Sequence, residues 1–204
     1  MYIICLDLEG VLTPEIWEEV ATTTEIDKLK LTTRDIPDYD VLMKQRLNIL
    51  KTNNITLDDI QKIIANIELL PGALDFIEWL QSNSQVLIAT GSFIEFIQPI
   101  AKKLGYPLIF CNNLEVSNTR IITNYHLRLK DMKKKTVRAL KKLQYNVIAV
   151  GDSYNDIKML KEADFGILFR PSENVKRDYP QFTVATEYSE LKDLIGNILH
   201  SGSI

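Results

Sequence analysis

Short apolar runs that alternate with segments of helical periodicity constrain the fold of this chain most strongly. Strands buried on both faces of a parallel sheet read as nearly continuous apolar stretches. Runs of this kind occur at YIICLDL (2–8), QVLIAT (85–90), PLIFCN (107–112), NVIAVGDS (146–153), FGILFR (165–170) and FTVAT (182–186). Helical patterns such as ALDFIEWLQSN and KKKTVRALKKLQ separate them. Because helices between strands produce parallel pairing, we predict an α/β fold: a doubly wound, mostly parallel sheet with a Rossmann-like core.

One segment, residues 14–70, interrupts this alternation. Its apolar residues follow helical spacing, as in LDDIQKIIANIELL, and it contains no strand pattern. It begins directly after the first strand and ends at Pro71-Gly72, so it would lie over the end of that strand like a lid. We therefore predict a helical cap over 14–70 and an α/β core over 1–13 and 71–204.

A second interruption is the hairpin pattern LEVSNTRIITNYHLRLK, which turns near Ser117-Asn118 and whose role the sequence leaves open.

Neither histidine is a candidate catalyst, because His126 lies beside this hairpin and His200 near the C-terminus. The aromatic residues Trp17, Phe93 and Phe96 fit a core or a pocket wall.

Composition limits the class of protein. The 204 residues are 46% hydrophobic and 25% charged, the balance of a folded chain rather than a disordered one. A net charge of −3 and a pI near 5.5 give no electrostatic reason to expect binding to nucleic acid or to an anionic membrane. Cys5 and Cys111 lie in apolar runs, as small core residues do. No apolar stretch approaches the ~18 residues that a membrane-spanning helix needs. We therefore expect a cytoplasmic protein that binds neither nucleic acid nor a membrane.

Two carboxylates end the first strand, in the stretch DLEGVL. Side chains alternate between the faces of a strand, so Asp7 and Glu9 point the same way while Leu8 points the other way. Neighbouring carboxylates repel each other unless a cation, water or a shared proton relieves the repulsion. A solvated strand end before a turn at Gly10 is the alternative to a functional site.

A second acidic cluster follows the fourth strand, in GDSYND. Gly151 allows a tight strand-to-helix turn, and Asp152 and Asp156, four residues apart at a helix start, can face one direction. Alone, this cluster could be an N-cap with an acid in the first helical turn. Because parallel strands place their sites at one edge of the sheet, the two clusters together predict a hard-oxygen site suited to Mg²⁺.

The order of these motifs resembles that of the haloacid dehalogenase-like phosphatases. The first motif matches DLEGVL, the second Thr90 in VLIATGSF, the third a lysine in KKKTV and the fourth GDSYND. The helical insertion after the first motif resembles the phosphoserine phosphatase branch. Longer stretches are similar to the bifunctional phosphoserine phosphatase/homoserine phosphotransferase subfamily: DLEGVLTPEIW, TTRDIPDYDVLMKQRL, GDSYND, GILF, and ENV with YPQF. The resemblance implies a role in serine and threonine biosynthesis.

Two positions depart from the wider family pattern. Glu9 stands where most members have aspartate, a departure that the subfamily shares. Thr90-Gly91-Ser92 stands in place of the subfamily's Ser-Asp-Thr and is closer to the Ser-Gly-Gly of ordinary phosphoserine phosphatases. The phosphoryl acceptor therefore stays open between water and homoserine.

The resemblance assigns the acidic residues to Mg²⁺ and to phosphoryl transfer. It implies that Asp7 is both the nucleophile that forms an aspartyl phosphate and a metal ligand. Glu9 is implied to be the general acid and base, with its backbone carbonyl on the metal. Asp152 would bind the metal directly and Asp156 through water.

The resemblance also implies residues that hold the phosphate. Thr90 and the N–H of Gly91 would bind phosphate oxygens, and Asn155 would contact the phosphate or the surroundings of the metal. Lys133 fits the family spacing for the lysine that neutralises the phosphoryl group and Asp7. Lys134 and Lys135 stay open, because the sequence does not fix the phase of the helix.

In the cap, Glu15 and Arg46 match subfamily positions that bind the ammonium and the carboxylate of O-phosphoserine. Arginine binds a carboxylate through two parallel hydrogen bonds, and glutamate pairs with an ammonium group. The alternative is a pair of solvated helix residues.

Three classes of function compete. The first is a Mg²⁺-dependent phosphoserine phosphatase that transfers the phosphoryl group to water or also to homoserine, with another phosphomonoester substrate as the alternative. The second is a non-enzymatic, phospho-accepting signalling module, which the lid and Glu9 disfavour. The third is a silent binding module, which we would expect to lack one of the four motifs. The oligomeric state stays open between a monomer and a homodimer.

Overall fold

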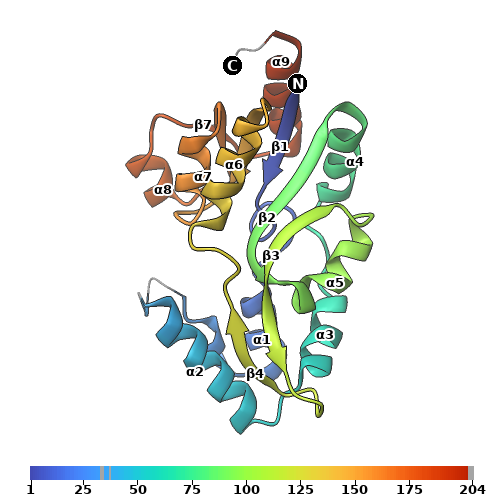
Figure 1. Ribbon diagram of the computed structural model, residues 1–204, viewed down its shortest axis with the longest axis vertical. Helices are drawn as coiled ribbons and strands as arrows, with labels where there is room; N and C mark the ends of the chain where they lie inside the picture. Colours follow the sequence, from blue (N-terminus) through green and yellow to red (C-terminus); the bar gives the residue numbers. More distant parts are fainter. Residues whose placement is uncertain (33–34, 37, 202–204) are drawn as a thin grey trace.

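The computed structural model describes residues 1–32, 35–36 and 38–201. In this part of the chain, seven strands form one sheet in the order β4-β3-β2-β1-β5-β6-β7 (Figure 1). They are β1 (Tyr2–Leu6), β2 (Gln85–Phe93), β3 (Leu108–Val116), β4 (Ile122–His126), β5 (Asn146–Gly151), β6 (Phe165–Phe169) and β7 (Thr183–Ala185). All neighbours pair in parallel except β3 and β4. The predicted doubly wound, mostly parallel sheet is confirmed.

Helices cover both faces of the sheet (Figure 1). They are α4 (Ala73–Asn83), α5 (Ile94–Lys103), α6 (Met132–Lys142), α7 (Ile157–Glu162), α8 (Glu173–Asp178) and α9 (Tyr188–Ser201). Helices α6 and α7 pack on one face of the sheet, and α4, α5 and α9 pack on the other. None of the described helices is both long enough and apolar enough to cross a membrane.

The central strand β1 explains why the apolar runs are continuous. Successive residues of β1 alternate between two cores: Ile4 and Leu6 belong to one, and Ile3 and Cys5 belong to the other. Because helices cover both cores, every one of these side chains is buried. Cys5 is thus a core residue, as predicted.

The insertion after β1 is helical, as predicted, and its described residues form no strand. It contains α1 (Ile16–Thr24), the 3₁₀-helix η1 (Asp27–Lys30), α2 (Tyr39–Thr52) and α3 (Leu57–Ala65). The Asp38 side chain caps α2, and Thr56 and Asp59 form a capping box at the start of α3. Positions 33–34 and 37 of TTRDIPDYDVLMKQRL lie outside the described residues. The domain boundaries around 14–70 stay a prediction.

The predicted hairpin is present as β3 and β4, and it packs against the cap. In Figure 1 it extends away from the rest of the sheet to lie beside the cap helices. Strand β4 contacts α2. In the turn, Arg120 pairs with Asp58 of α3 at 2.7 Å, and its carbonyl accepts a hydrogen bond from the Leu57 N–H. The hairpin therefore links the edge of the sheet to the cap.

Candidate active site

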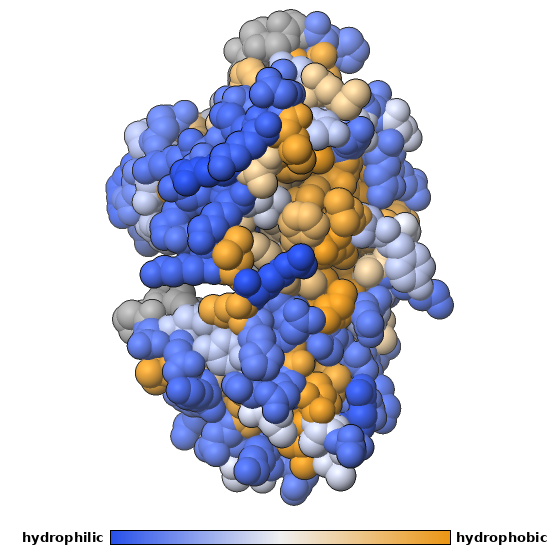
Figure 2. Space-filling model, viewed as in Figure 1, coloured by the Kyte–Doolittle hydropathy of each residue, from blue (hydrophilic) through white to orange (hydrophobic). Residues whose placement is uncertain are grey.

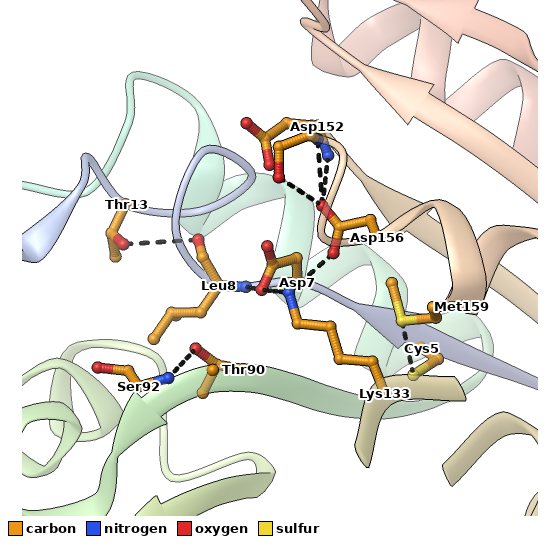
Figure 3. Close-up of polar contacts among 12 residues, drawn as sticks. Cys5, Asp7, Leu8, Thr13, Thr90, Ser92, Lys133, Asp152, Asp156 and Met159 are labelled. Atoms are coloured by element: carbon orange, nitrogen blue, oxygen red, sulfur yellow. Dashed lines mark hydrogen bonds and ion pairs between the residues drawn. The ribbon is translucent and has the colours of Figure 1, made fainter. Parts of the chain in front are cut away.

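The predicted site residues of the core meet at the carboxyl ends of β1, β2 and β5. Asp7 directly follows β1, Thr90 lies near the end of β2, and Asp152 directly follows β5. The Asp7 N–H donates to the Val150 carbonyl at 2.9 Å, which continues the pairing of β1 with β5. Asp7 is 5% exposed and Thr90 is 1% exposed. Parallel pairing thus brings polar groups from distant parts of the sequence to one buried place (Figure 3).

Lys133, in the first turn of α6, joins two of the acids. Its Nζ lies 2.7 Å from Asp7 Oδ1 and 2.8 Å from Asp156 Oδ1 (Figure 3). Burial alone would lower the pKa of Lys133, but the charges of Asp156 and Asp7 outweigh burial and raise it above its ordinary value. Lys134 instead lies 3.8 Å from Glu162. The structure therefore places Lys133, rather than its neighbour, against the acids.

Asp7, Asp152 and Asp156 form a compact group of carboxylates. One oxygen atom from each lies within 4.8 Å of the other two. Burial, followed by the charge of Asp156, raises the pKa of Asp7 well above its usual value. The same two causes raise the pKa of Asp152 to about 7. Three close acids beside one lysine leave an excess of negative charge, which a divalent cation would neutralise.

The oxygen atoms of these acids differ in their hydrogen bonds. Asp156 Oδ1 accepts from Lys133, and its Oδ2 accepts from the N–H groups of Asp152 and Ser153, each at 3.1 Å. Asp7 Oδ1 accepts from Lys133 and from a neighbouring backbone N–H, whereas its Oδ2 accepts no hydrogen bond from any described residue. The Asp7 Oδ2 atom is thus free for a metal or a reacting atom, and Asp156 is suited to act through bound water.

Two glycines allow the acids to come this close. A Cβ built on Gly151 would lie 2.3 Å from Asp156 Cγ, and one built on Gly10 would lie 2.5 Å from Asp152 Cγ. No side chain fits at such distances, and Gly10 also has a φ of +77°, which favours glycine. At Gly10 and Gly151 the backbone itself therefore packs against the carboxylates of Asp152 and Asp156.

The end of β2 presents a hydroxyl and a backbone segment to the same place. Thr90 Oγ1 accepts from the Ser92 N–H at 3.1 Å. The Asn112 side-chain amide donates to the Gly91 carbonyl at 2.8 Å, and its oxygen accepts from the Arg128 N–H at 3.1 Å. Sequence reasoning missed Asn112, and its position at the end of the run PLIFCN was the signal that could have identified it.

Glu9 and Glu15 lie together where the cap joins the core. Glu9 Oε2 accepts from the Ile16 N–H at 3.1 Å, at the start of α1. Burial and the charge of Glu15 raise the pKa of Glu9 to about 8. At neutral pH Glu9 is therefore mainly protonated and can donate a proton. An ammonium group at this place would pair with the Glu15 carboxylate.

A cavity of about 340 Å³ lies between the cap and the core. Its wall includes Glu15, Trp17 and Arg46 from the cap and the loop 153–155 from the core. Figure 2 shows a hollow between these two parts at the left of the molecule. Asn155 is exposed on this wall and makes no hydrogen bond to any described residue, so the structure does not tie it to the acidic group.

Arg46 brings a buried positive charge to this cavity. The residue is 7% exposed, and its Nη2 donates to the Leu31 carbonyl at 2.7 Å. Burial lowers the pKa of Arg46 to about 10, so the guanidinium stays charged at neutral pH. The cavity is thus lined by the basic group of Arg46 and the acidic group of Glu15. A zwitterionic amino acid requires this combination of charges.

The chain belongs to the haloacid dehalogenase-like hydrolase family, whose model matches residues 2–164. This segment contains all four motifs, and the family recognised from them is confirmed. Phosphoserine phosphatase ThrH of Pseudomonas aeruginosa is 53% identical to this chain over 192 residues, which cover 94% of each protein. A phosphoserine phosphatase of Pseudomonas syringae pv. tomato is 51% identical over 190 residues, which cover 93% of this chain and 80% of the relative.

Solved structures of related enzymes have the same fold. A crystal structure of phosphoserine phosphatase in its apo form matches with a TM-score of 0.77 at 23% identity and covers 96% of this chain and 98% of that one. A phospho-aspartyl intermediate analogue of phosphoserine phosphatase matches with a TM-score of 0.73 at 23% identity and covers 94% of this chain and 97% of that one. These likenesses confirm the α/β fold class.

Proposed function

We propose that this protein is a Mg²⁺-dependent phosphoserine phosphatase that works through an aspartyl phosphate on Asp7. The observation that carries the proposal is the cavity between cap and core, because it is lined by both charges that an amino-acid head group needs. Relatives named phosphoserine phosphatase, at 53% and 51% identity, support this substrate. The same proposal places the reaction in amino-acid biosynthesis in the cytoplasm.

The residues present fit a Mg²⁺ ion. Mg²⁺ binds through one or two carboxylates and keeps several waters and substrate phosphate oxygens around it. Asp7, Asp152 and the backbone carbonyl of Glu9 would hold the ion directly, and Asp156, whose oxygens are occupied by hydrogen bonds, would act through water. When bound, the ion would neutralise charge on the phosphoryl group and on the nucleophile.

The first half of the reaction breaks the phosphate ester. Asp7 attacks phosphorus through one carboxylate oxygen and forms a P–O bond, while the bond from phosphorus to the serine oxygen breaks. Lys133, the Thr90 hydroxyl and the Gly91 N–H hold the phosphoryl oxygens during this transfer. Glu9, whose pKa is raised by burial, donates its proton to the serine oxygen. Serine leaves as the alcohol, and Glu9 becomes a carboxylate.

The second half of the reaction releases Asp7. The Glu9 carboxylate accepts a proton from water, whose oxygen attacks phosphorus as the bond from phosphorus to Asp7 breaks. The product is inorganic phosphate, and both carboxyl groups return to their starting states. Homoserine in the place of water would yield O-phosphohomoserine by the same steps, and this transfer is a second branch of the proposal.

The test is to incubate the protein with Mg²⁺ and O-phosphoserine, with and without homoserine, and to identify the products by phosphorus NMR. We expect inorganic phosphate in both reactions and an additional O-phosphohomoserine signal when homoserine is present. Asp7→Asn protein is the control for contaminating phosphatases. Phosphate alone in both reactions would contradict the transferase branch. Absence of O-phosphoserine turnover would contradict the whole proposal, and turnover of a different phosphomonoester would identify another substrate.

A further inference from the structure

Arg46 is a buried cation with an unused hydrogen-bond donor. Its Nη2 donates to the Leu31 carbonyl, but its buried Nε has no partner among the described residues. Buried donors without partners are rare in folded proteins, because the loss of their hydration is not compensated. Arg46 also lines the cavity of about 340 Å³. The free donor therefore indicates a ligand with an acceptor group on this wall.

Trp17 of α1 restricts how the guanidinium group lies. The central carbon of the Arg46 guanidinium is 4.5 Å from the centroid of the Trp17 ring. This stacking covers one face of the guanidinium with an aromatic surface, while the Leu31 carbonyl holds one of its nitrogens. The indole is itself held by the buried Phe96 of α5, whose ring centroid lies 5.5 Å away at an interplanar angle of 68°. Two contacts thus give the Arg46 head group one orientation.

We propose that Trp17 is a positioning residue, which holds Arg46 so that its free donors bind the carboxylate of the amino-acid substrate. This inference rests on the proposed function, because it requires a substrate with a carboxylate. Two parallel hydrogen bonds from a guanidinium to a carboxylate form only when the two planes are aligned. Without the indole, Arg46 keeps its charge but can rotate, so affinity for the carboxylate falls while the chemistry at Asp7 is unchanged.

Two substrates separate this role from a merely structural one. O-phosphoserine and O-phosphoethanolamine share the phosphate and the ammonium group, but only O-phosphoserine has a carboxylate. Trp17→Leu is expected to lower kcat/KM for O-phosphoserine about tenfold, mainly through a higher KM. For O-phosphoethanolamine, kcat/KM is expected to change by less than about twofold. Trp17→Phe retains an aromatic face and should recover most of the loss.

The matched control is Trp79→Leu. Trp79 lies on α4, outside the cavity wall, and its indole ring also has a cation near it, the Lys192 Nζ at 5.9 Å. This substitution removes the same volume and a similar contact, so it should change kcat/KM for neither substrate. A comparable selective loss in Trp79→Leu would contradict the assignment of the effect to Trp17.

A double variant tests whether Trp17 acts through Arg46. Arg46→Met removes the carboxylate site, so adding Trp17→Leu should not lower kcat/KM for O-phosphoserine any further. Additive losses, or equal losses on both substrates, would overturn the positioning role. If circular dichroism shows that Trp17→Leu does not fold, Trp17→Met, whose longer and more flexible side chain fills space more readily but offers no aromatic face, makes the same comparison with and without Arg46→Met. Wild-type protein without activity on O-phosphoserine would instead contradict the proposed function, and the carboxylate site with it.

Discussion

Replacing Asp152 by asparagine should stabilise the protein when Mg²⁺ is absent. Folding raises the pKa of Asp152 from 3.8 to about 7, through burial and the charge of Asp156. An acid with a raised pKa favours the folded state while it is protonated, and this contribution is lost as the pH rises towards the folded pKa. The charge of Asp152 thus has no effect on stability near pH 4 or below, and it has its full destabilising effect above pH 7.

The magnitude follows from the same pKa values. The rise from 3.8 to about 7 corresponds to about 4 kcal/mol at pH 8, and partial exposure to water reduces this to about 2–4 kcal/mol. For a chain of 204 residues, 1 kcal/mol shifts the melting temperature by about 2–4 °C. Asp152→Asn should therefore melt about 4–16 °C above the wild type at pH 8 in EDTA, and at about the same temperature near pH 4.

Mg²⁺ should act in the opposite direction, because the ion requires the carboxylate that the variant lacks. At a concentration of about 100 times Kd, the ion is expected to stabilise the wild type by about 2.7 kcal/mol and the variant hardly at all. Thermal melts at pH 4, 6 and 8, in EDTA and in Mg²⁺, measure both effects. Asp193→Asn is the control, because it removes an exposed charge on α9, away from the site. Equal melting temperatures in EDTA at pH 8, or a full Mg²⁺ response in Asp152→Asn, would refute the reasoning.

Three further predictions concern the reaction and the metal. Asp7→Asn removes the nucleophile, so turnover should fall at least about a thousandfold while circular dichroism shows an unchanged fold; greater residual activity would exclude Asp7 as the nucleophile. Glu9→Gln removes proton transfer but keeps the backbone carbonyl, so turnover should slow ~10²- to 10⁴-fold and the aspartyl phosphate should accumulate. Acid quenching and mass spectrometry of the Asp7 peptide measure this accumulation, and a loss of Mg²⁺ affinity in its place would make Glu9 a structural ligand. Gly10→Ala would place a methyl group 2.5 Å from Asp152 Cγ, so calorimetry should show weaker Mg²⁺ binding, whereas Gly196→Ala, whose methyl group would meet nothing within 4 Å, should bind normally.

The fold class was predictable because its signals are local. Each strand of the parallel sheet is buried on both faces, so burial alone makes its sequence apolar, and the helices between strands show their own period. Helix α8, Glu173–Asp178, was not predicted because only one of its six residues, Val175, is buried, so its sequence shows no apolar period. It is held instead by a cap from Ser172 and by the buried side chain of Val175.

The acidic part of the candidate site was also predictable, for a related reason. Asp7 and Asp152 each follow an apolar run directly, and the ends of parallel strands meet at one edge of a sheet. Two short motifs, far apart in the sequence, therefore predicted one site without knowledge of side-chain positions. The sequence also determined the charges of Glu15 and Arg46, and the resemblance assigned their roles.

Tertiary structure decided which of these groups touch and how they are oriented. Lys133 contacts the acids because α6 begins at Met132 and packs on the sheet with that side of the helix facing Asp7 and Asp156. The three consecutive lysines at 133–135 do not by themselves show which of them faces the site. The stacking of Arg46 on Trp17 joins two cap helices, and the bond from Asn112 to the Gly91 carbonyl joins two strands. Such pairs leave no local pattern, because each partner comes from a different element and only packing brings the two into contact.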